Sequence, residues 1–401
     1  MAQKESELFR LNRRLNTLSI FRSILEDDVV GRLQALIDSI GTGSLEEQLR
    51  RYGDFTGALF EAGGNITTYV RTFLQDDMNF YLRNTVKRRE MSENMHRCLE
   101  EELDVMQELA SLPPSVLISQ IGCSGFLPEW DTAECDIPTE YHEMLNNIPT
   151  RGYGKFARYR FFTVKNGTLD PVKYADPQSL DQLYGYERER RMVYENTRAL
   201  AEGIGAANVL LYGDAGTGKS STIKACANAF ADRGVRLIEF DKKQLNAIPK
   251  IIDQLYDTPL KYIFFIDDLS FTTEDDNFSY LKGMLEGSST GKSDNIAIYA
   301  SSNRRHLVRE LNEDRAGSDI HLNDTLQQTM SLSARFGLTI TFQKPEKDLY
   351  LEIVKKLAAE EEVTVPEEEL CRKAEAFAIR SNGRSPRTAK QFIQQILIGI
   401  Q

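Results

Sequence analysis

The sequence has 401 residues, enough for two or three domains, and its hydrophobic content of 41% and charged content of 27% are ordinary for a globular protein. The formal net charge of −11 argues against a protein that coats nucleic acid over its whole surface. No run of about eighteen apolar residues is present. The first residues also lack the apolar core of a signal peptide. We therefore expect a cytoplasmic protein without a membrane segment.

Cysteine and histidine are scattered along the chain and form no C-x-x-C pair. The cysteines are Cys98, Cys123, Cys135, Cys226 and Cys371, and the histidines are His96, His142, His306 and His321. An odd number of dispersed cysteines favours reduced thiols in a cytosolic protein, and neither residue type has the spacing of a zinc site.

Residues 1–150 are expected to form a mainly helical domain. Leucines between positions 8 and 18 recur at helical spacing. Ser44, followed three residues later by a glutamate, has the form of a capping box. A charge-rich helix is predicted over 92–112, where two prolines end it. The proline-containing segment 113–150 is interpreted as rich in loop. No chemical motif occurs in this region.

Residues 151–175 are interpreted as a linker with a hairpin. Arginine, lysine, tyrosine and phenylalanine alternate over 151–164, and Asn166-Gly167 suits a tight turn. Such a pattern can stack and neutralise single-stranded nucleic acid. The alternative, which we favour, is that the aromatic side chains pack on a neighbouring domain while the arginines stay in solvent.

The strongest motif of the chain follows an expected short buried strand at 208–212. It matches G-x-x-x-x-G-K-[ST] without a gap and is followed by helix-forming residues. The motif and its next residue are Gly213, Asp214, Ala215, Gly216, Thr217, Gly218, Lys219, Ser220 and Ser221. Strand, glycine loop and helix are the structural context that this motif requires.

The chemistry of the motif explains its spacing. Its three glycines allow backbone angles that direct successive N–H groups at a phosphate. The helix that follows adds free N–H donors and its positive dipole end. Lys219 supplies a charge for the outer phosphates, and the Ser220 hydroxyl is suited to ligate Mg²⁺. The motif therefore predicts a site for ATP and Mg²⁺.

Strands and helices alternate after this motif. Strands are expected at 237–241, 261–268, 295–303 and 337–342, with helices at 242–255 and 278–286. This alternation predicts an α/β fold, a three-layer αβα sandwich around a parallel sheet. We place this nucleotide-binding domain at 176–343 and a small helical lid at 344–401.

Polar residues at strand ends complete the expected site. Asp267 and Asp268 follow a buried strand, so that Asp267 is expected to hold Mg²⁺ and Asp268 to polarise the attacking water. Asn303 ends the next strand, where its amide can orient that water or sense the γ-phosphate.

Two arginines are further candidates. Arg335 precedes the last strand and is placed to reach the nucleotide of a neighbouring subunit. Arg387 lies at the tip of the final helix, which Ser385 caps and Pro386 begins. For both arginines, a surface salt bridge is the alternative interpretation.

Together these motifs resemble those of AAA+ ATPases. The resemblance makes 213–220 the Walker A motif, 262–268 Walker B, Asn303 sensor 1, Arg335 the arginine finger and Arg387 sensor 2. Over 175–401 the chain more narrowly resembles a bacterial family, domain-of-unknown-function family 815. The stretches that carry this are YENTRALAEGIGAANVLLYGDAGTGKSS, FFIDDLSFTTEDD, LKGMLEG, SSNRRHL and SLSARFGL.

The chain departs from the common AAA+ pattern in three respects. Walker B ends in Asp268 where most AAA+ enzymes have glutamate, although the narrower family shares the aspartate. Ala334 stands where that family tends to have an aspartate before the arginine, which weakens the assignment of Arg335. No aromatic-glycine pore loop follows the second strand, which counts against a polypeptide-threading unfoldase.

The resemblance implies an AAA+ protein that binds Mg²⁺-ATP and hydrolyses it where subunits of a homo-oligomer meet, driving or gating the remodelling of an unknown protein partner. The helical domain 1–150 is a candidate for docking that partner. Two alternatives stay open: a nucleotide-gated switch with little turnover, and a nucleic-acid loader of the helicase-loader type.

Overall fold

The computed structural model describes residues 7–123, 125–175, 178–256, 258–269, 271–272, 281, 285, 294–303, 308–309, 335–381 and 383–400. The chain divides into two compact units, Met1–Arg158 and Tyr159–Gln401. The four-part division drawn from the sequence, with boundaries after 150, 175 and 343, stays a prediction. The expected helix at 278–286 lies outside the described residues apart from Leu281 and Leu285.

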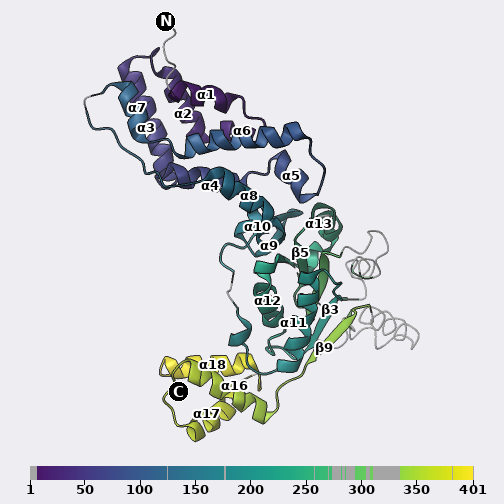
Figure 1. Cartoon of the computed structure of the whole chain (residues 1–401). Helices are drawn as coiled ribbons and strands as arrows, with labels where there is room; N and C mark the ends of the chain where they lie inside the picture. The colour runs from purple at the N-terminus through teal and green to yellow at the C-terminus, as the bar shows by residue number, and fades with distance from the viewer. Residues whose placement is uncertain are drawn as a thin grey trace. The chain divides into compact units, whose positions relative to one another are not determined.

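The first unit is built from short helices (Figure 1). They are α1 (Glu7–Asn16), the 3-10 helix η1 (Arg22–Glu26), α2 (Asp28–Ser39), α3 (Leu45–Glu61), α4 (Ile66–Asp76), α5 (Phe80–Val86), α6 (Glu93–Ala110), α7 (Pro114–Ile121), α8 (Ile137–Asn146), α9 (Ile148–Arg151) and α10 (Lys155–Arg158). The expectation of a mainly helical N-terminal region is confirmed.

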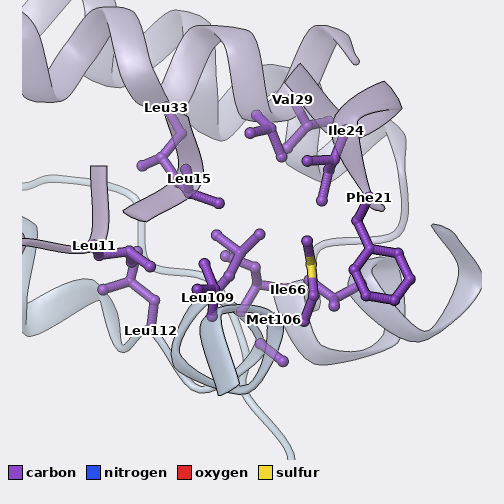
Figure 2. Close-up of a cluster of buried hydrophobic side chains, with 14 of the residues drawn as sticks. Leu11, Leu15, Phe21, Ile24, Val29, Leu33, Ile66, Met106, Leu109 and Leu112 are labelled. Atoms are coloured by element: carbon purple, nitrogen blue, oxygen red, sulfur yellow. The ribbon is translucent and has the colours of Figure 1, made fainter. Parts of the chain in front are cut away.

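The apolar stripes of these helices meet in one core. Figure 2 shows Leu11 and Leu15 of α1 and Leu33 of α2 around Met106 and Leu109 of α6. Leu11 and Leu15 are four positions apart and therefore lie on the same helical face. The stripe read in the sequence is therefore ordinary core.

The prediction that 113–150 is rich in loop is wrong, because helices make up more than half of that segment. Pro114, Pro138 and Pro149 each occupy the first turn of a helix, α7, α8 and α9 respectively. The first turn needs no backbone N–H donor, and the fixed φ of proline suits it. Proline here begins helices instead of marking a loop.

The second unit is organised around a seven-stranded sheet with the order β2-β1-β4-β5-β7-β3-β9. Its strands are β1 (Phe161–Lys165), β2 (Thr168–Pro171), β3 (Val209–Gly213), β4 (Val235–Phe240), β5 (Lys261–Ile266), β7 (Ile296–Ser302) and β9 (Leu338–Phe342). All neighbouring pairs are parallel except the β1–β2 hairpin. Two-residue strands β6 (Phe271–Thr272) and β8 (Val308–Arg309) pair separately.

Helices cover both faces of this sheet. They are α11 (Glu187–Glu202), α12 (Lys219–Ala229) and α13 (Ile248–Leu255), with short 3-10 segments η2 (Leu180–Gln182), η3 (Ala231–Arg233) and η4 (Lys242–Ala247). Alternate residues of β5 point to opposite faces, yet Ile263 and Phe264 are both fully buried. This arrangement confirms the predicted αβα sandwich around a mostly parallel sheet.

The helix expected over 242–255 is in fact two elements. η4 ends at Ala247, and α13 begins at Ile248 with Pro249 in its first turn. Proline cannot donate the backbone hydrogen bond that a continuous helix would need there.

A helical lid follows the sheet, shown in yellow-green and yellow in Figure 1. It consists of α16 (Lys347–Glu360), α17 (Glu367–Arg380) and α18 (Pro386–Leu397). These helices share a core that includes Tyr350, Ala374 and Phe392. The purely helical C-terminal segment predicted from the sequence is confirmed.

Four of the five aromatic rings in the basic-aromatic segment are buried and are not available for stacking with nucleobases, and the fifth, Tyr159, is half-buried. The buried rings are Tyr153 and Phe156 in the first unit and Phe161 and Phe162 in the second. Arg158 pairs with Asp76, and Arg160 pairs with Asp232, each at 3.0 Å. The buried rings and the two ion pairs therefore contribute to packing within their own units. The hairpin turn lies at Asn166 and Gly167 as predicted, both with positive φ.

Candidate functional site

The sheet topology brings three loops together. β7 lies between β3 and β5, with Leu211 opposite Ser301 and Ile266 opposite Ala300. Parallel strands end at the same edge of a sheet, which is where α/β proteins bind their ligands. The glycine loop after β3, the two acids after β5 and Asn303 after β7 therefore meet at one place.

The glycine loop has the conformation that its sequence predicts. Gly213, Gly216 and Gly218 have φ angles of 138°, 78° and 92°, which side-chain-bearing residues rarely adopt. A Cβ added to Gly213 would stand 2.0 Å from the carbonyl oxygen of Phe342 in β9. Gly218 is the N-cap of α12, and the N–H groups of the first helical turn have no partner within the helix. They are donors for an anion.

Lys219 is only 5% exposed, and its ammonium group is bonded within this loop. It donates to the carbonyl oxygens of Gly213 at 2.9 Å and Asp214 at 2.7 Å, and to Oδ1 of Asn303 at 2.9 Å. Burial lowers the pKa of Lys219; nearby carboxylates, Asp214 first among them, oppose that shift. The lysine therefore bridges the loop and the end of β7.

Ser220 and Asp267 meet as a pair of hard oxygen ligands. The Ser220 hydroxyl donates to Oδ1 of Asp267 at 2.6 Å. One hydroxyl and one carboxylate fit Mg²⁺, which takes few protein ligands and completes its shell with phosphate oxygens and water. Accordingly, the described residues contain no group of three or more acidic, histidine or cysteine side chains that could hold a metal by themselves.

Asp268 is held in an uncommon backbone conformation. Its φ is 48°, in the left-handed region, which aspartate tolerates better than most residues. Its Oδ1 accepts a hydrogen bond from Nδ2 of Asn303 at 2.8 Å. Asn303 therefore joins Lys219 on one side to Asp268 on the other, and the structure brings these three candidates together.

Two loop residues attach the glycine loop to its surroundings. Oδ2 of Asp214 accepts from the backbone N–H of Lys344 at 2.8 Å, and the Asp214 N–H donates to Phe342 at 3.1 Å. Gly213 and Asp214 do not line the cavity at this site, whereas Ala215, Gly216, Thr217, Gly218, Lys219, Ser220 and Ser221 do. Asp214 fastens the loop to the segment that leads into the lid.

That cavity has a volume of about 490 Å³, within the range of small-molecule sites. The glycine loop, the acids and Asn303 form its polar part. Leu183, Tyr184, Tyr186, Ile353 and Leu357 contribute apolar and aromatic surface from the segment before α11 and from α16.

Sequence reasoning assigned no role to this apolar part. A local signal exists in Gly185, which stands between two tyrosines just before α11. A Cβ on Gly185 would lie 3.0 Å from Cδ1 of Ile353 in the lid. The glycine thus permits a close approach of lid and sheet domain, but its lid partner cannot be identified from the local sequence.

The two candidate arginines are placed differently. Arg387 lines the cavity from the first turn of α18, with Ser385 as N-cap and Pro386 in the first turn as predicted, and its backbone N–H donates to Gly216 at 3.2 Å. Lys390, one turn further, also lines the cavity and was missed. Arg335 is half-buried before β9 and is not among the lining residues. Ala334 lies outside the described residues.

Comparison with known proteins finds one matching family and several solved structures of limited similarity. A family model described as "Protein of unknown function (DUF815)" matches residues 155–399, more than half of the chain. The Thermotoga maritima RuvB Holliday junction branch migration motor resembles the chain with a TM-score of 0.39 and 17% identity, covering 55% of this chain and 65% of that one. A point mutant of the same RuvB has a TM-score of 0.40 and 17% identity, and the match covers 56% of this chain and 66% of that one. The chain thus spans slightly less than two thirds of these relatives. No curated protein matches it in sequence.

Proposed function

The chain belongs to the DUF815 family, and we propose that it binds Mg²⁺-ATP in the cavity of its second unit and hydrolyses it where two subunits meet, to drive or gate the remodelling of a protein partner. One observation carries the proposal. The glycine loop ends in a buried lysine, Lys219, whose ammonium donates to the Gly213 carbonyl, and the next residue, Ser220, donates to Asp267. A glycine turn without a ligand has no need of a buried ammonium, because burial of a charge is costly.

The polar part of the cavity supplies the elements of phosphoryl transfer. Loop N–H groups and Lys219 bind the phosphates, and Asp268, oriented by Asn303, accepts a proton from the attacking water. Ser220 and Asp267 would hold Mg²⁺, which neutralises charge on the phosphate oxygens. The apolar part, near Tyr184 and Ile353, is suited to the base of the nucleotide.

The closure of the lid would depend on whether nucleotide is bound. Arg387 enters the cavity from α18 while its backbone is bonded to the glycine loop. A phosphate bound in that loop attracts the guanidinium, which provides differential stabilisation of a closed lid.

Nucleotide binding and turnover are tested by two substitutions. Lys219→Ala removes a charge-assisted hydrogen bond of about 1.5–3 kcal/mol, so ATP affinity should fall about 10- to 150-fold. Asp268→Asn should keep affinity and lower turnover by about 10²–10⁴. Calorimetry and phosphate release measure the two effects. Lys224→Ala is the control, because Lys224 lies on the same helix but pairs with Glu239 outside the cavity. Equal ATP affinity in Lys219→Ala and Lys224→Ala contradicts the assignment.

Assembly is tested separately through Arg335. If this arginine completes the site of a neighbouring subunit, Arg335→Ala should lower turnover by about 10³ or more without changing ATP affinity. Light scattering of the wild-type protein should show a larger mass with ATP than without it. An unchanged monomer in both conditions counts against the shared site.

A second candidate function is a nucleotide-gated switch with little turnover. The observation that favours it concerns Asp268: Oδ1 of its carboxylate already accepts a hydrogen bond from Asn303, and its side chain is one methylene shorter than that of glutamate. Tight ATP binding with negligible phosphate release would support the switch. The loader alternative loses most of its motif, because four of the five aromatic side chains in 151–164 are buried.

A further inference from the structure

β7 places a buried hydroxyl directly behind the two acids of the site. Ser301 is 2% exposed, lines the cavity and sits in the strand between β3 and β5. It is two residues before Asn303 and begins the stretch SSNRRHL, but the sequence analysis gave it no role. Its Oγ contacts both Asp267 and Asp268.

We infer that Ser301 is a positioning residue that fixes the Asp267 carboxylate for Mg²⁺ and the backbone of Asp268 for catalysis. This inference rests on the proposed function, because it concerns how the same site receives its metal ion. It assigns Ser301 a role that is exerted through the two acids.

The first contact orients the metal-binding carboxylate. Oδ1 of Asp267 accepts from the Ser301 hydroxyl, from the Ser220 hydroxyl at 2.6 Å and from the Asp268 N–H at 3.1 Å. Among the residues that the structure describes, none donates to Oδ2 of Asp267. Three donors on one oxygen fix the carboxylate plane and leave the other oxygen for Mg²⁺ or its water. Partners that orient a ligand in this way raise metal affinity.

The second contact supports an unfavourable backbone conformation. The Asp268 N–H also donates to the Ser301 oxygen at 3.1 Å, at a residue whose φ is 48°. Left-handed backbone costs energy and persists only where its surroundings hold it. The single hydroxyl of Ser301 thus donates to one acid and accepts from the next.

The adjacent residue provides a matched control. Ser302 is also buried, and its hydroxyl donates to the carbonyl oxygen of Leu269 at 2.8 Å. Successive residues of a strand point to opposite faces, and Ser302 does not line the cavity. Ser301→Ala and Ser302→Ala therefore each remove one buried hydroxyl from β7, but only the first touches the acids.

The test measures the binding of a non-hydrolysable ATP analogue to the full chain, with EDTA and across a Mg²⁺ titration. In EDTA, Ser301→Ala should bind the analogue with the same affinity as wild type. In the titration, the Mg²⁺ concentration that gives half of the increase in analogue affinity should rise about 10- to 100-fold. Ser302→Ala should match wild type in both conditions. Ser301→Thr, which keeps the hydroxyl, should recover most of the Mg²⁺ response.

The outcomes separate this inference from the proposal on which it rests. A wild-type protein that fails to bind the analogue overturns the proposed function and removes this inference with it. Wild-type binding with the same Mg²⁺ dependence in Ser301→Ala overturns only the role of Ser301. If Ser301→Ala does not fold, Ser301→Cys, which has a weaker donor, is measured in its place. An unshifted Mg²⁺ response in that variant then refutes the inference.

Discussion

The contact between the glycine loop and the lid gives a prediction whose size follows from the structure. Gly216 has a φ of 78°, and a Cβ added there would lie 3.1 Å from Cβ of Arg387 and 3.1 Å from Oγ of Ser385. Gly218 has a φ of 92°, but an added Cβ would meet nothing within 4 Å. The variants Gly216→Ala and Gly218→Ala therefore share the backbone strain and differ in the collision with α18.

The two contributions have known sizes. A left-handed residue with a side chain costs about 1–2 kcal/mol, which both variants incur. Overpacking by a methyl group costs about 1–3 kcal/mol, which only Gly216→Ala incurs. We expect Gly218→Ala to lose about 1–2 kcal/mol of stability and Gly216→Ala about 2–5 kcal/mol. The difference between the two stability losses measures the packing of Gly216 against α18.

The measurement must follow the second unit alone. Trp130 is the single tryptophan and belongs to the first unit, so its fluorescence does not report on the lid. Native-state hydrogen exchange of peptides from β3, β9 and α18, without nucleotide, resolves the opening of this unit. If the two variants lose equal stability within about 0.5 kcal/mol, the packing between loop and lid carries no energy, and the proposed coupling of nucleotide to lid loses its basis.

Two further predictions concern the lid and the first unit. Arg384 holds the pKa of Glu375 below its ordinary value of 4.5, so this ion pair stabilises the lid above pH 4.5 and that contribution is lost as the pH falls through the lowered value. Thermal unfolding across pH should therefore show Glu375→Gln less stable at neutral pH, with the difference from wild type closing below pH 4.5; a constant difference would contradict this. In the first unit, the buried Glu102 carboxylate accepts from three successive backbone N–H groups before η1. Glu102→Ala should cost about 3 kcal/mol or more in urea unfolding followed by Trp130 fluorescence, whereas Glu108→Ala, which breaks a half-exposed ion pair on the same helix, should cost less than about 1 kcal/mol. Equal losses would refute a structural role for Glu102.

The glycine loop and the strand-end residues could be predicted from the sequence because their conformation depends on residues close to them in the chain. The glycine loop is one continuous segment whose backbone angles and helix start follow from its own residues, so Gly213 to Ser220 adopted the predicted form. The acids after β5 and Asn303 after β7 were predictable for a related reason, since parallel strands place their carboxyl ends at one edge of the sheet. The binding and catalytic roles of these residues, like those of Arg335 and Arg387, remain predictions.

Prolines and aromatics were ambiguous for a physical reason. Proline suits both a loop and the first turn of a helix, and the choice at Pro138 and Pro149 depended on whether the following residues could bury an apolar face. The alternation of Arg158 to Phe162 suits either a stacking surface or a buried strand. Only burial, which depends on what packs against the segment, distinguished the two.

The sequence by itself determined the glycine loop, the αβα fold and the helical lid, because periodicity and short-range backbone chemistry encode them. The tertiary structure alone decided which residues complete the cavity. Ile353 reaches Gly185 across more than half of the second unit's chain, and Ser301 meets Asp267 only because β7 lies beside β5. Such contacts depend on the order of strands and the closure of the lid, which no local pattern records.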